Sequence, residues 1–188
     1  MAIPSDARRQ CNDAALMCYG TAYIFENRAK SIRRKIHFLS FLGIAVPASV
    51  GAIVGSFTLK PEIFSIILFF AAILGLIQLI FSIWSLVAEW NNRLSYYLES
   101  KSSNYRLADL YEKLANITTL SDQDFSTKLG VLDVESQLRA DLDNRHDVTD
   151  KEKRIGMRAG LRKYQRGCVG CGKIPTDMKP NECGVCGK

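Results

Sequence analysis

Two long stretches without charge constrain the fold of this 188-residue chain more than any other feature. Residues 37–59 and 63–88 contain no Lys, Arg, Asp or Glu over 23 and 26 positions, respectively. As helices they would be about 35 and 39 Å long, against roughly 30 Å for the hydrocarbon core of a bilayer. A helix in a soluble bundle seldom stays apolar on every face for this length. The sequence therefore predicts two transmembrane helices.

The connection between these stretches is very short, which predicts a tight antiparallel hairpin. It holds Lys60, Pro61 and Glu62 alone. Basic residues crowd the entry to the first stretch, whereas the connection offers one lysine; the basic residues are Arg28, Lys30, Arg33, Arg34 and Lys35. The positive-inside bias then places both chain ends in the cytoplasm. Almost no mass would lie beyond the membrane, which excludes a receptor for an extracellular ligand.

Charge is segregated along the chain, although the total is only +6. Residues 1–36 carry +4 (seven basic, three acidic) and residues 37–88 carry 0. Residues 89–149 carry −4 (seven basic, eleven acidic) and residues 150–188 carry +6 (ten basic, four acidic). We interpret the four segments as an N-terminal cytoplasmic helix, a transmembrane hairpin, further cytoplasmic helices, and a basic helix with a cysteine-rich tail.

Small residues recur on both predicted spans at the four-residue spacing that lets helix backbones approach closely. The helix-packing candidates are Gly43, Gly51, Gly55, Ala71 and Gly75. Polar and small residues also share one face of the second span, namely Gly75, Gln78, Ser82 and Ser85. This stripe either holds the two helices of the hairpin together or lines a pore. Aromatic residues near its end, Trp84, Trp90, Tyr96 and Tyr97, are expected at the depth of the lipid headgroups.

The segment after the hairpin has the apolar periodicity of cytoplasmic helices. Ser121 and Asp124 predict the start of one helix, which reaches about residue 143. Its acidic residues are expected on a solvated face; they are Asp133, Glu135, Asp141 and Asp143.

A basic helix follows, introduced by a capping box formed by Thr149 and Glu152. Four arginines repeat every fourth residue and therefore align along one face. They are Arg154, Arg158, Arg162 and Arg166. This stripe either pairs with the acidic helix just before it, within one subunit or between subunits, or binds the phosphates of anionic lipid or of nucleic acid. Nucleic acid is the least favoured of these partners.

The tail carries two C-x-x-C motifs with eleven residues between them. Their cysteines are Cys168, Cys171, Cys183 and Cys186. Two such knuckles can supply four thiolates to one tetrahedral zinc ion, and the following glycines, Gly172 and Gly187, are expected to turn N–H groups toward the sulfurs. The tail has almost no apolar core, so a structural zinc would provide its folding energy. Disulfides are disfavoured in a cytoplasmic tail.

The predicted fold class is therefore an all-α membrane protein: a two-helix transmembrane hairpin, long cytoplasmic helices and a small C-terminal zinc-ribbon-like knuckle. No group of residues resembles a catalytic site, because neither histidine lies in an acid–base or nucleophile arrangement and no phosphate-binding loop is present. We expect that the protein is not an enzyme.

Two family resemblances follow from these parts. The order of helices over residues 5–117 resembles the SLATT family of bacterial two-transmembrane proteins, and the spacing of the four cysteines resembles the mobilome CxxCx(11)CxxC proteins. The resemblance implies an effector of bacterial conflict systems that acts beside a nucleotide-generating enzyme or a reverse transcriptase and damages the cell's own membrane when triggered.

Together, residues and resemblance lead us to expect a homo-oligomeric effector in the bacterial inner membrane, in phage defence or mobile-element conflict. It would form a pore or disrupt the lipid bilayer, and its cytoplasmic part would receive the trigger. The alternative is a membrane-tethered zinc-knuckle module that binds nucleic acid or recruits a partner protein. A scaffold that holds a partner at the membrane is the third interpretation.

Overall fold

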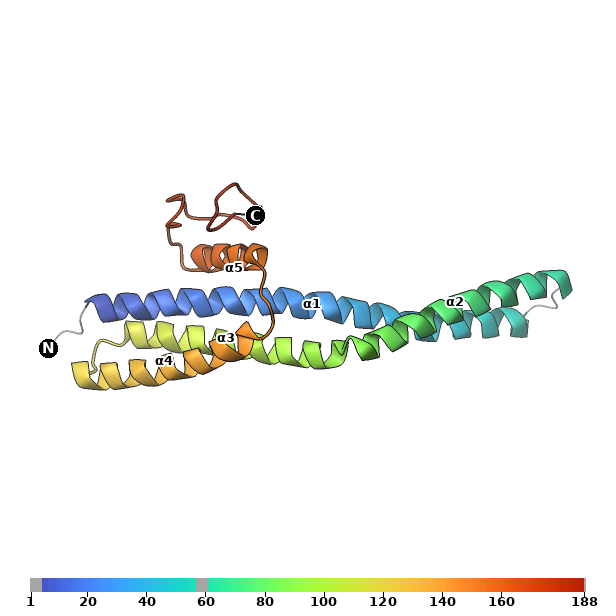
Figure 1. Ribbon diagram of the computed structural model, residues 1–188, viewed down its shortest axis with the longest axis horizontal. Coiled ribbons are helices and arrows are strands. Elements are labelled where there is room, and N and C mark those ends of the chain that lie inside the picture. Colours follow the sequence, from blue (N-terminus) through green and yellow to red (C-terminus); the bar gives the residue numbers. More distant parts are fainter. Residues whose placement is uncertain (1–4, 57–60, 188) are drawn as a thin grey trace. The chain divides into compact units, whose positions relative to one another are not determined.

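The computed structural model describes residues 5–56 and 61–187, and this part of the chain contains five helices and no strand (Figure 1). The helices are α1 (Ser5–Ser56), α2 (Pro61–Val87), α3 (Trp90–Asn116), α4 (Asp122–Asn144) and α5 (Asp150–Lys163). The all-helical prediction is thereby confirmed for the described residues. Residues 57–60, which include the end of the first predicted span and Lys60 of the predicted loop, lie outside them.

Both helix starts predicted from capping motifs are confirmed. The Ser121 side chain accepts a hydrogen bond from the backbone N–H of Asp124 at the start of α4. At the start of α5, Thr149 and Glu152 form a reciprocal capping box. Each cap satisfies an N–H group that the first helical turn leaves without a partner, which fixes where the chain turns into each helix.

The chain divides into two compact units, one of which is a helical bundle. This bundle unit comprises Met1–Arg28 and Tyr96–Lys188. Its main core lies between α1, α3 and α4, where apolar side chains recur at helical spacing on each inward face. The buried members are Cys11, Ala15, Cys18, Leu107, Ala108, Tyr111, Leu114, Ala115, Phe125 and Leu129.

The α5 helix packs on α1 through glycines that bring the two backbones into contact. A Cβ atom added at Gly160 would lie 2.7 Å from the carbonyl oxygen of Leu16, and one at Gly156 would lie 2.7 Å from that of Gly20. No side chain larger than hydrogen fits at such separations. The two glycines of α5 therefore serve close helix packing.

The acidic side of α4 is not wholly solvated, which corrects the expectation from sequence. The Asp143 carboxylate is buried and accepts hydrogen bonds at 2.7–3.1 Å from four side chains, those of Tyr96, Ser100, Asn104 and Arg139. A buried charge is tolerated only when it is paired and hydrogen-bonded in this way. Asp143 therefore joins α3 to α4 within the core.

Arg28, which the sequence places among the basic residues before the first span, binds residues at the start of α5. Its guanidinium donates to both carboxylate oxygens of Glu152, at 2.6 and 2.8 Å, and to the carbonyl oxygen of His146 at 2.6 Å. This bidentate pair lowers the pKa of Glu152 to about 2. Arg28 thus anchors the loop before α5 and the capping box itself.

The second unit, Ala29–Ser95, is the hairpin unit. It comprises the remainder of α1, all of α2 and the first turns of α3. The helical pattern after the second span predicts no break, but α2 ends at Val87, and Glu89 adopts a left-handed backbone conformation with φ of 51° before α3 begins at Trp90. The expected aromatic cluster is also divided, because Tyr96 and Tyr97 pack on Phe25 in the bundle unit.

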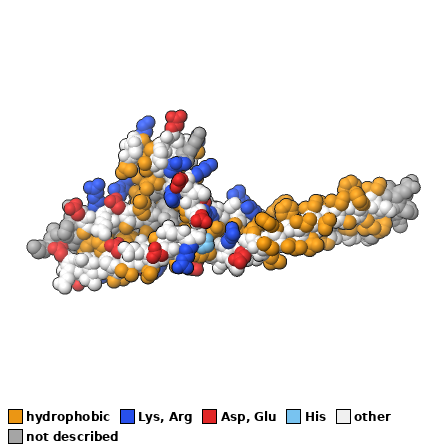
Figure 2. Space-filling view, in the orientation of Figure 1, with side chains coloured by type: hydrophobic (Ala, Val, Ile, Leu, Met, Phe, Trp, Pro, Cys, Tyr) orange, Lys and Arg blue, Asp and Glu red, His pale blue; other side chains and the backbone are white. Residues whose placement is uncertain are grey.

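The helices of the hairpin unit carry large apolar side chains on their outer surface (Figure 2). Two helices are long and apolar enough to cross a membrane: their best windows lie within Asp6–Ile53 and Phe64–Val87, with mean hydropathies of 1.8 and 2.8. None of either window is buried.

Candidate metal centre

The two cysteine knuckles follow α5 as a pair of short loops, each closed by its own backbone. The N–H of Gly172 donates to the carbonyl oxygen of Cys168 at 2.7 Å, and the N–H of Gly187 donates to that of Cys183 at 2.8 Å. Gly172 has a positive φ of 72°, a conformation that glycine adopts at little cost. The two glycines thus close the knuckles by donating to carbonyl oxygens.

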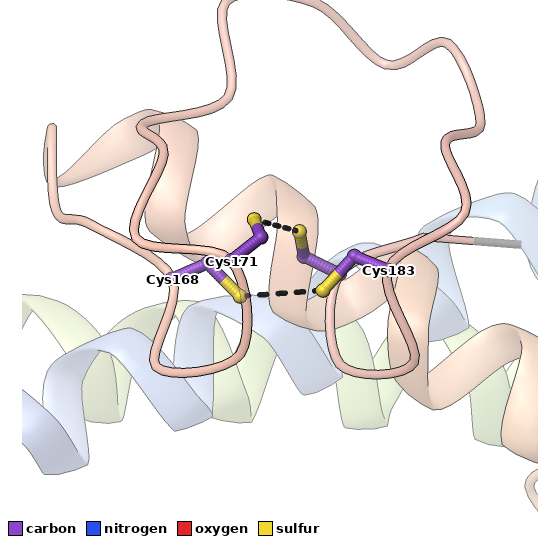
Figure 3. Close-up of side chains that lie close together, drawn as sticks. Cys168, Cys171 and Cys183 are labelled. Atoms are coloured by element: carbon purple, nitrogen blue, oxygen red, sulfur yellow. Dashed lines mark hydrogen bonds between the residues drawn. The ribbon is translucent and has the colours of Figure 1, made fainter.

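The four sulfurs converge between the two loops (Figure 3). The Sγ atoms of Cys168 and Cys183 lie 3.8 Å apart, as do those of Cys171 and Cys186. All four Sγ atoms lie within 4.8 Å of one another. A tetrahedron with zinc–sulfur bonds of about 2.3 Å has edges of about 3.8 Å. The four cysteines therefore could bind one metal ion, and all six cysteines of the chain are free thiols.

Backbone N–H groups near the sulfurs favour the thiolate form. Gly170 and Val185, each two residues after the first cysteine of its knuckle, point their N–H groups at Cys168 Sγ and Cys183 Sγ from 3.4 Å. Hydrogen bonds from Cys186 and Val185 lower the pKa of the Cys183 thiol to about 6, whereas burial raises the pKa of the Cys186 thiol. Four thiolates this close repel one another, so a divalent cation is the group that allows all of them to ionise.

The knuckles rest on an apolar base supplied by the helices. Cys168 and Cys186 are buried with Leu16 of α1 and Leu161 of α5 in a second core cluster. Four protein ligands would leave no open position for a substrate on a tetrahedral ion bound here, which is the ligand set of a structural site.

Arg158 links α5 to the tail, a role that the sequence pattern did not reveal. Its guanidinium donates to the carbonyl oxygens of Asp177 and Cys186, at 2.8 and 3.2 Å, and forms an ion pair with the Asp177 carboxylate at 3.1 Å. The N–H of Lys179 and the guanidinium of Arg158 lower the pKa of Asp177. The buried Arg158 therefore holds both the linker between the knuckles and Cys186, one of the four candidate ligands.

The other arginines of the stripe differ from one another in environment. Arg166 pairs with Asp13 of α1, and Arg162 is exposed. The Nε atom of Arg154 is buried with no hydrogen-bond partner among the described residues. Neither of the two ion pairs of the stripe, Arg158–Asp177 and Arg166–Asp13, involves the acidic helix α4.

Asn181 is a second residue at the centre that sequence reasoning missed. Its side-chain oxygen accepts the N–H of Cys183 at 3.0 Å, and its side-chain nitrogen lies 3.9 Å from Cys186 Sγ. An Asn two residues before a knuckle is a turn signal, because its side chain can bond the backbone two residues on. That spacing could have identified it.

Some of the predicted packing and polar residues of the hairpin lie between α1 and α2, whereas others lie on its outer surface. A Cβ atom at Gly43 would lie 2.8 Å from the amide nitrogen of Gln78, so these two residues meet between α1 and α2. A Cβ atom at Gly51, Gly55 or Gly75 would meet no described atom within 4 Å. Ser82 is exposed, whereas Ala71 and Ser85 are partly covered.

A family comparison covers almost the whole chain. The model of a family described as "Mobilome CxxCx(11)CxxC protein" matches residues 8–188, which include both knuckles and both apolar helices. No curated protein and no solved structure matches the chain.

Proposed function

Because the chain belongs to the mobilome CxxCx(11)CxxC protein family, we propose that it is a homo-oligomeric effector of the bacterial inner membrane. In this proposal the hairpin unit spans the bilayer, both chain ends lie in the cytoplasm, and the assembled hairpins form a pore or disrupt the bilayer. The setting would be phage defence or mobile-element conflict, as in the SLATT proteins that the order of helices resembles.

One observation carries the proposal, namely the unburied apolar surface of the hairpin. The best window within Phe64–Val87 has a mean hydropathy of 2.8, and none of that window is buried. Phe69, Leu76 and Trp84 are each about 60% exposed. Apolar surface on this scale in water drives aggregation, whereas in a bilayer it is the ordinary outer surface of a helix.

Self-association is supported by surfaces in each unit. In the hairpin, the open glycines Gly51, Gly55 and Gly75 are the kind of residue that packs against another transmembrane helix. In the bundle unit, α4 buries one apolar face in the core and exposes a second apolar face on the surface. Its exposed members, spaced three or four residues apart, are Val131, Val134, Leu138 and Leu142.

The four cysteines would hold a structural zinc, which is the usual ion for a closed set of four thiolates. The metal would supply folding energy to a tail with little apolar core. The bundle unit would then receive the trigger, from a partner such as a nucleotide-generating enzyme or a reverse transcriptase. No step of this proposal requires the protein to be an enzyme.

Dye release tests the membrane activity directly. We expect the purified full-length protein to form oligomers in vesicles of bacterial lipid and to release entrapped calcein. If the stripe of α2 lines the pore, Ser82→Leu should reduce release while Ile83→Leu, one position along the same helix, should not. Stable oligomers that release no dye at any ratio of protein to lipid would contradict the effector proposal.

A second candidate function, recruitment of a partner protein to the membrane, is favoured by the surface beside the knuckles. Val169, between the first two cysteines, is 93% exposed. It borders a cavity of about 300 Å³ that Met17 and Met157 also line, together with the charged residues Arg9, Asp13 and Arg166. Exposed apolar residues of this kind suit a protein partner better than nucleic acid. Cells that tolerate overexpression of the full chain without membrane leakage would favour this function over the effector.

A further inference from the structure

The hairpin unit contains a cavity of about 530 Å³ between α1 and α2. Its walls are aromatic and aliphatic, with Phe38 and Leu42 on α1 and Phe81 on α2. All of the lining residues belong to Ala29–Ser95, so this cavity, called the groove below, lies entirely within the hairpin unit. A volume in this range is typical of sites for small molecules and lipids.

The groove has a polar end and an apolar end. Lys35 and Trp90 line it at one end, with the Lys35 ammonium 5.5 Å from the centre of the Trp90 ring. Val46 lies eleven positions further along α1, or about 16 Å along a helix. From Lys35 to Val46 the lining thus changes from a cation with aromatic neighbours to mainly aliphatic side chains, among which the Gln78 amide is the one polar group.

We propose that this groove binds an anionic phospholipid, with the phosphate at Lys35 and one acyl chain along the apolar walls. The inference rests on the proposed function in one respect, that the hairpin lies in a bilayer. A lysine at the membrane surface is stabilised by a phosphate, and tryptophan favours the same depth. The order of chemical groups along the groove is the order along a phospholipid.

The residues of the groove argue against a neighbouring helix as its occupant. Helices that pack in a membrane meet at small residues, where their backbones can approach. The groove is instead lined by large side chains, including Phe38, Phe81 and Trp84. The open glycines Gly51, Gly55 and Gly75 are not part of its lining. The hairpin therefore has separate surfaces for a lipid and for a second hairpin.

The two tryptophans of the chain provide the probe, because Trp84 and Trp90 both line the groove. The full-length protein is reconstituted in phosphatidylcholine vesicles that contain a minor lipid with brominated acyl chains, which quench tryptophan on contact. We expect brominated phosphatidylglycerol to reach half-maximal quenching at a roughly fivefold lower fraction than brominated phosphatidylcholine, which corresponds to one lysine–phosphate contact.

Charge variants at the same end of the hairpin separate the site from general attraction. Lys35→Gln should abolish the preference for phosphatidylglycerol, and Lys35→Arg should retain it. Arg93→Gln removes the same charge from an exposed residue of α3 that does not line the groove, so the preference should remain.

Three outcomes would overturn the lipid site. Equal quenching by the two lipids in the wild type shows that the groove has no headgroup preference, and a preference that survives Lys35→Gln shows that another group provides it. Weak quenching by both lipids in membrane-embedded protein shows that a neighbouring helix fills the groove. Failure of the protein to insert into vesicles would instead contradict the proposed function, and the lipid site with it.

Discussion

The bundle unit and the hairpin unit are both helical, but they differ in which side chains they bury. In the bundle unit, apolar side chains are buried between α1, α3 and α4, and buried charges such as Asp143 and Arg139 are paired. In the hairpin unit, most large apolar side chains of α2 are exposed. The bundle unit thus has an apolar interior of its own, whereas the apolar side chains of α2 lie on the surface of the hairpin unit.

Glycines show the same difference at the level of single residues. Gly156 and Gly160 of α5 are spaced four apart, as Gly51 and Gly55 of α1 are. The pair in α5 touches the α1 backbone within the same chain, whereas the pair in the hairpin meets no described atom within 4 Å. The spacing thus predicts a close helix approach in both units. Only the structure shows that the α5 pair contacts another helix of the same chain.

Removal of the proposed zinc should have the largest effect, and it should be confined to the bundle unit. Structural zinc in small peptides contributes about 10–16 kcal/mol at neutral pH. We expect Cys183→Ser, or treatment with a chelator, to unfold the tail and expose Leu16 and Leu161. Hydrogen exchange measures the unfolding, and the fluorescence of Trp84 and Trp90, both in the hairpin unit, should not change.

A cysteine of the core provides the matched control for this prediction. Cys11 is fully buried between α1, α3 and α4, and burial raises the pKa of its thiol. Cys11→Ser should lower the stability of the bundle by about 1–3 kcal/mol, as an added buried hydroxyl does, and leave one zinc per chain by elemental analysis. Loss of zinc from this variant, or full zinc content in Cys183→Ser, would contradict the assignment of the ligands.

Replacement of Asp143 by alanine should have the next largest effect, because the buried Arg139 would lose its buried partner and keep only the exposed Glu99. Breaking a buried ion pair in this way costs about 3–5 kcal/mol. The exposed Asp141 is the control on the same helix, and Asp141→Ala should change the free energy of unfolding by less than about 0.5 kcal/mol. Equal effects of the two substitutions in urea unfolding would show that the buried pair does not stabilise the bundle.

The same carboxylate predicts how stability depends on pH. Burial raises the pKa of Asp143, but hydrogen bonds from Arg139, Tyr96 and Ser100 outweigh it, so the pKa in the folded protein is lowered. The stabilisation is therefore fully present above the unfolded pKa of about 3.9 and is lost as the pH falls through the folded value. Wild-type protein should lose more stability than Asp143→Ala between pH 6 and pH 3.

How far the sequence predicts the structure depends on whether a feature is local. The capping motifs at Ser121 and Thr149 specify helix starts through bonds between residues three apart, and both are confirmed. The convergence of the cysteines follows from the geometry of each C-x-x-C loop. Arg139 lies four residues before Asp143 on α4, a spacing that the sequence shows. The other partners of Asp143 lie on α3, 39–47 residues away, and those of Arg28 lie in α5 and the loop before it, 118–124 residues away. No spacing within one helix indicates these distant contacts.

Substitution of Gly160 by alanine should have a smaller effect on stability. It should destabilise the bundle, whereas the same substitution at the exposed Gly130 should stabilise it. The new methyl group in Gly160→Ala would lie 2.7 Å from the Leu16 carbonyl oxygen, and overpacking of this kind costs about 1–3 kcal/mol. In Gly130→Ala the methyl group meets no described atom within 4 Å. Higher helix propensity should then stabilise α4 by up to about 1 kcal/mol. Urea unfolding that moves in the same direction for both variants would contradict the α1–α5 contact.

Substitution of Gly75 should have the smallest effect on the fold of a single chain. A Cβ atom at Gly75 meets no described atom within 4 Å, so Gly75→Ala and Gly75→Leu should leave the helix content of the hairpin unchanged. If this open face is where a second hairpin packs, leucine will hold the backbones apart, and chemical cross-linking in vesicles should show fewer oligomers for Gly75→Leu than for Ile73→Leu on the same helix. Unchanged cross-linking would show that the second hairpin contacts another face. Gly75 would then pack against no helix either within the chain or between chains, unlike Gly156 and Gly160, which pack against α1.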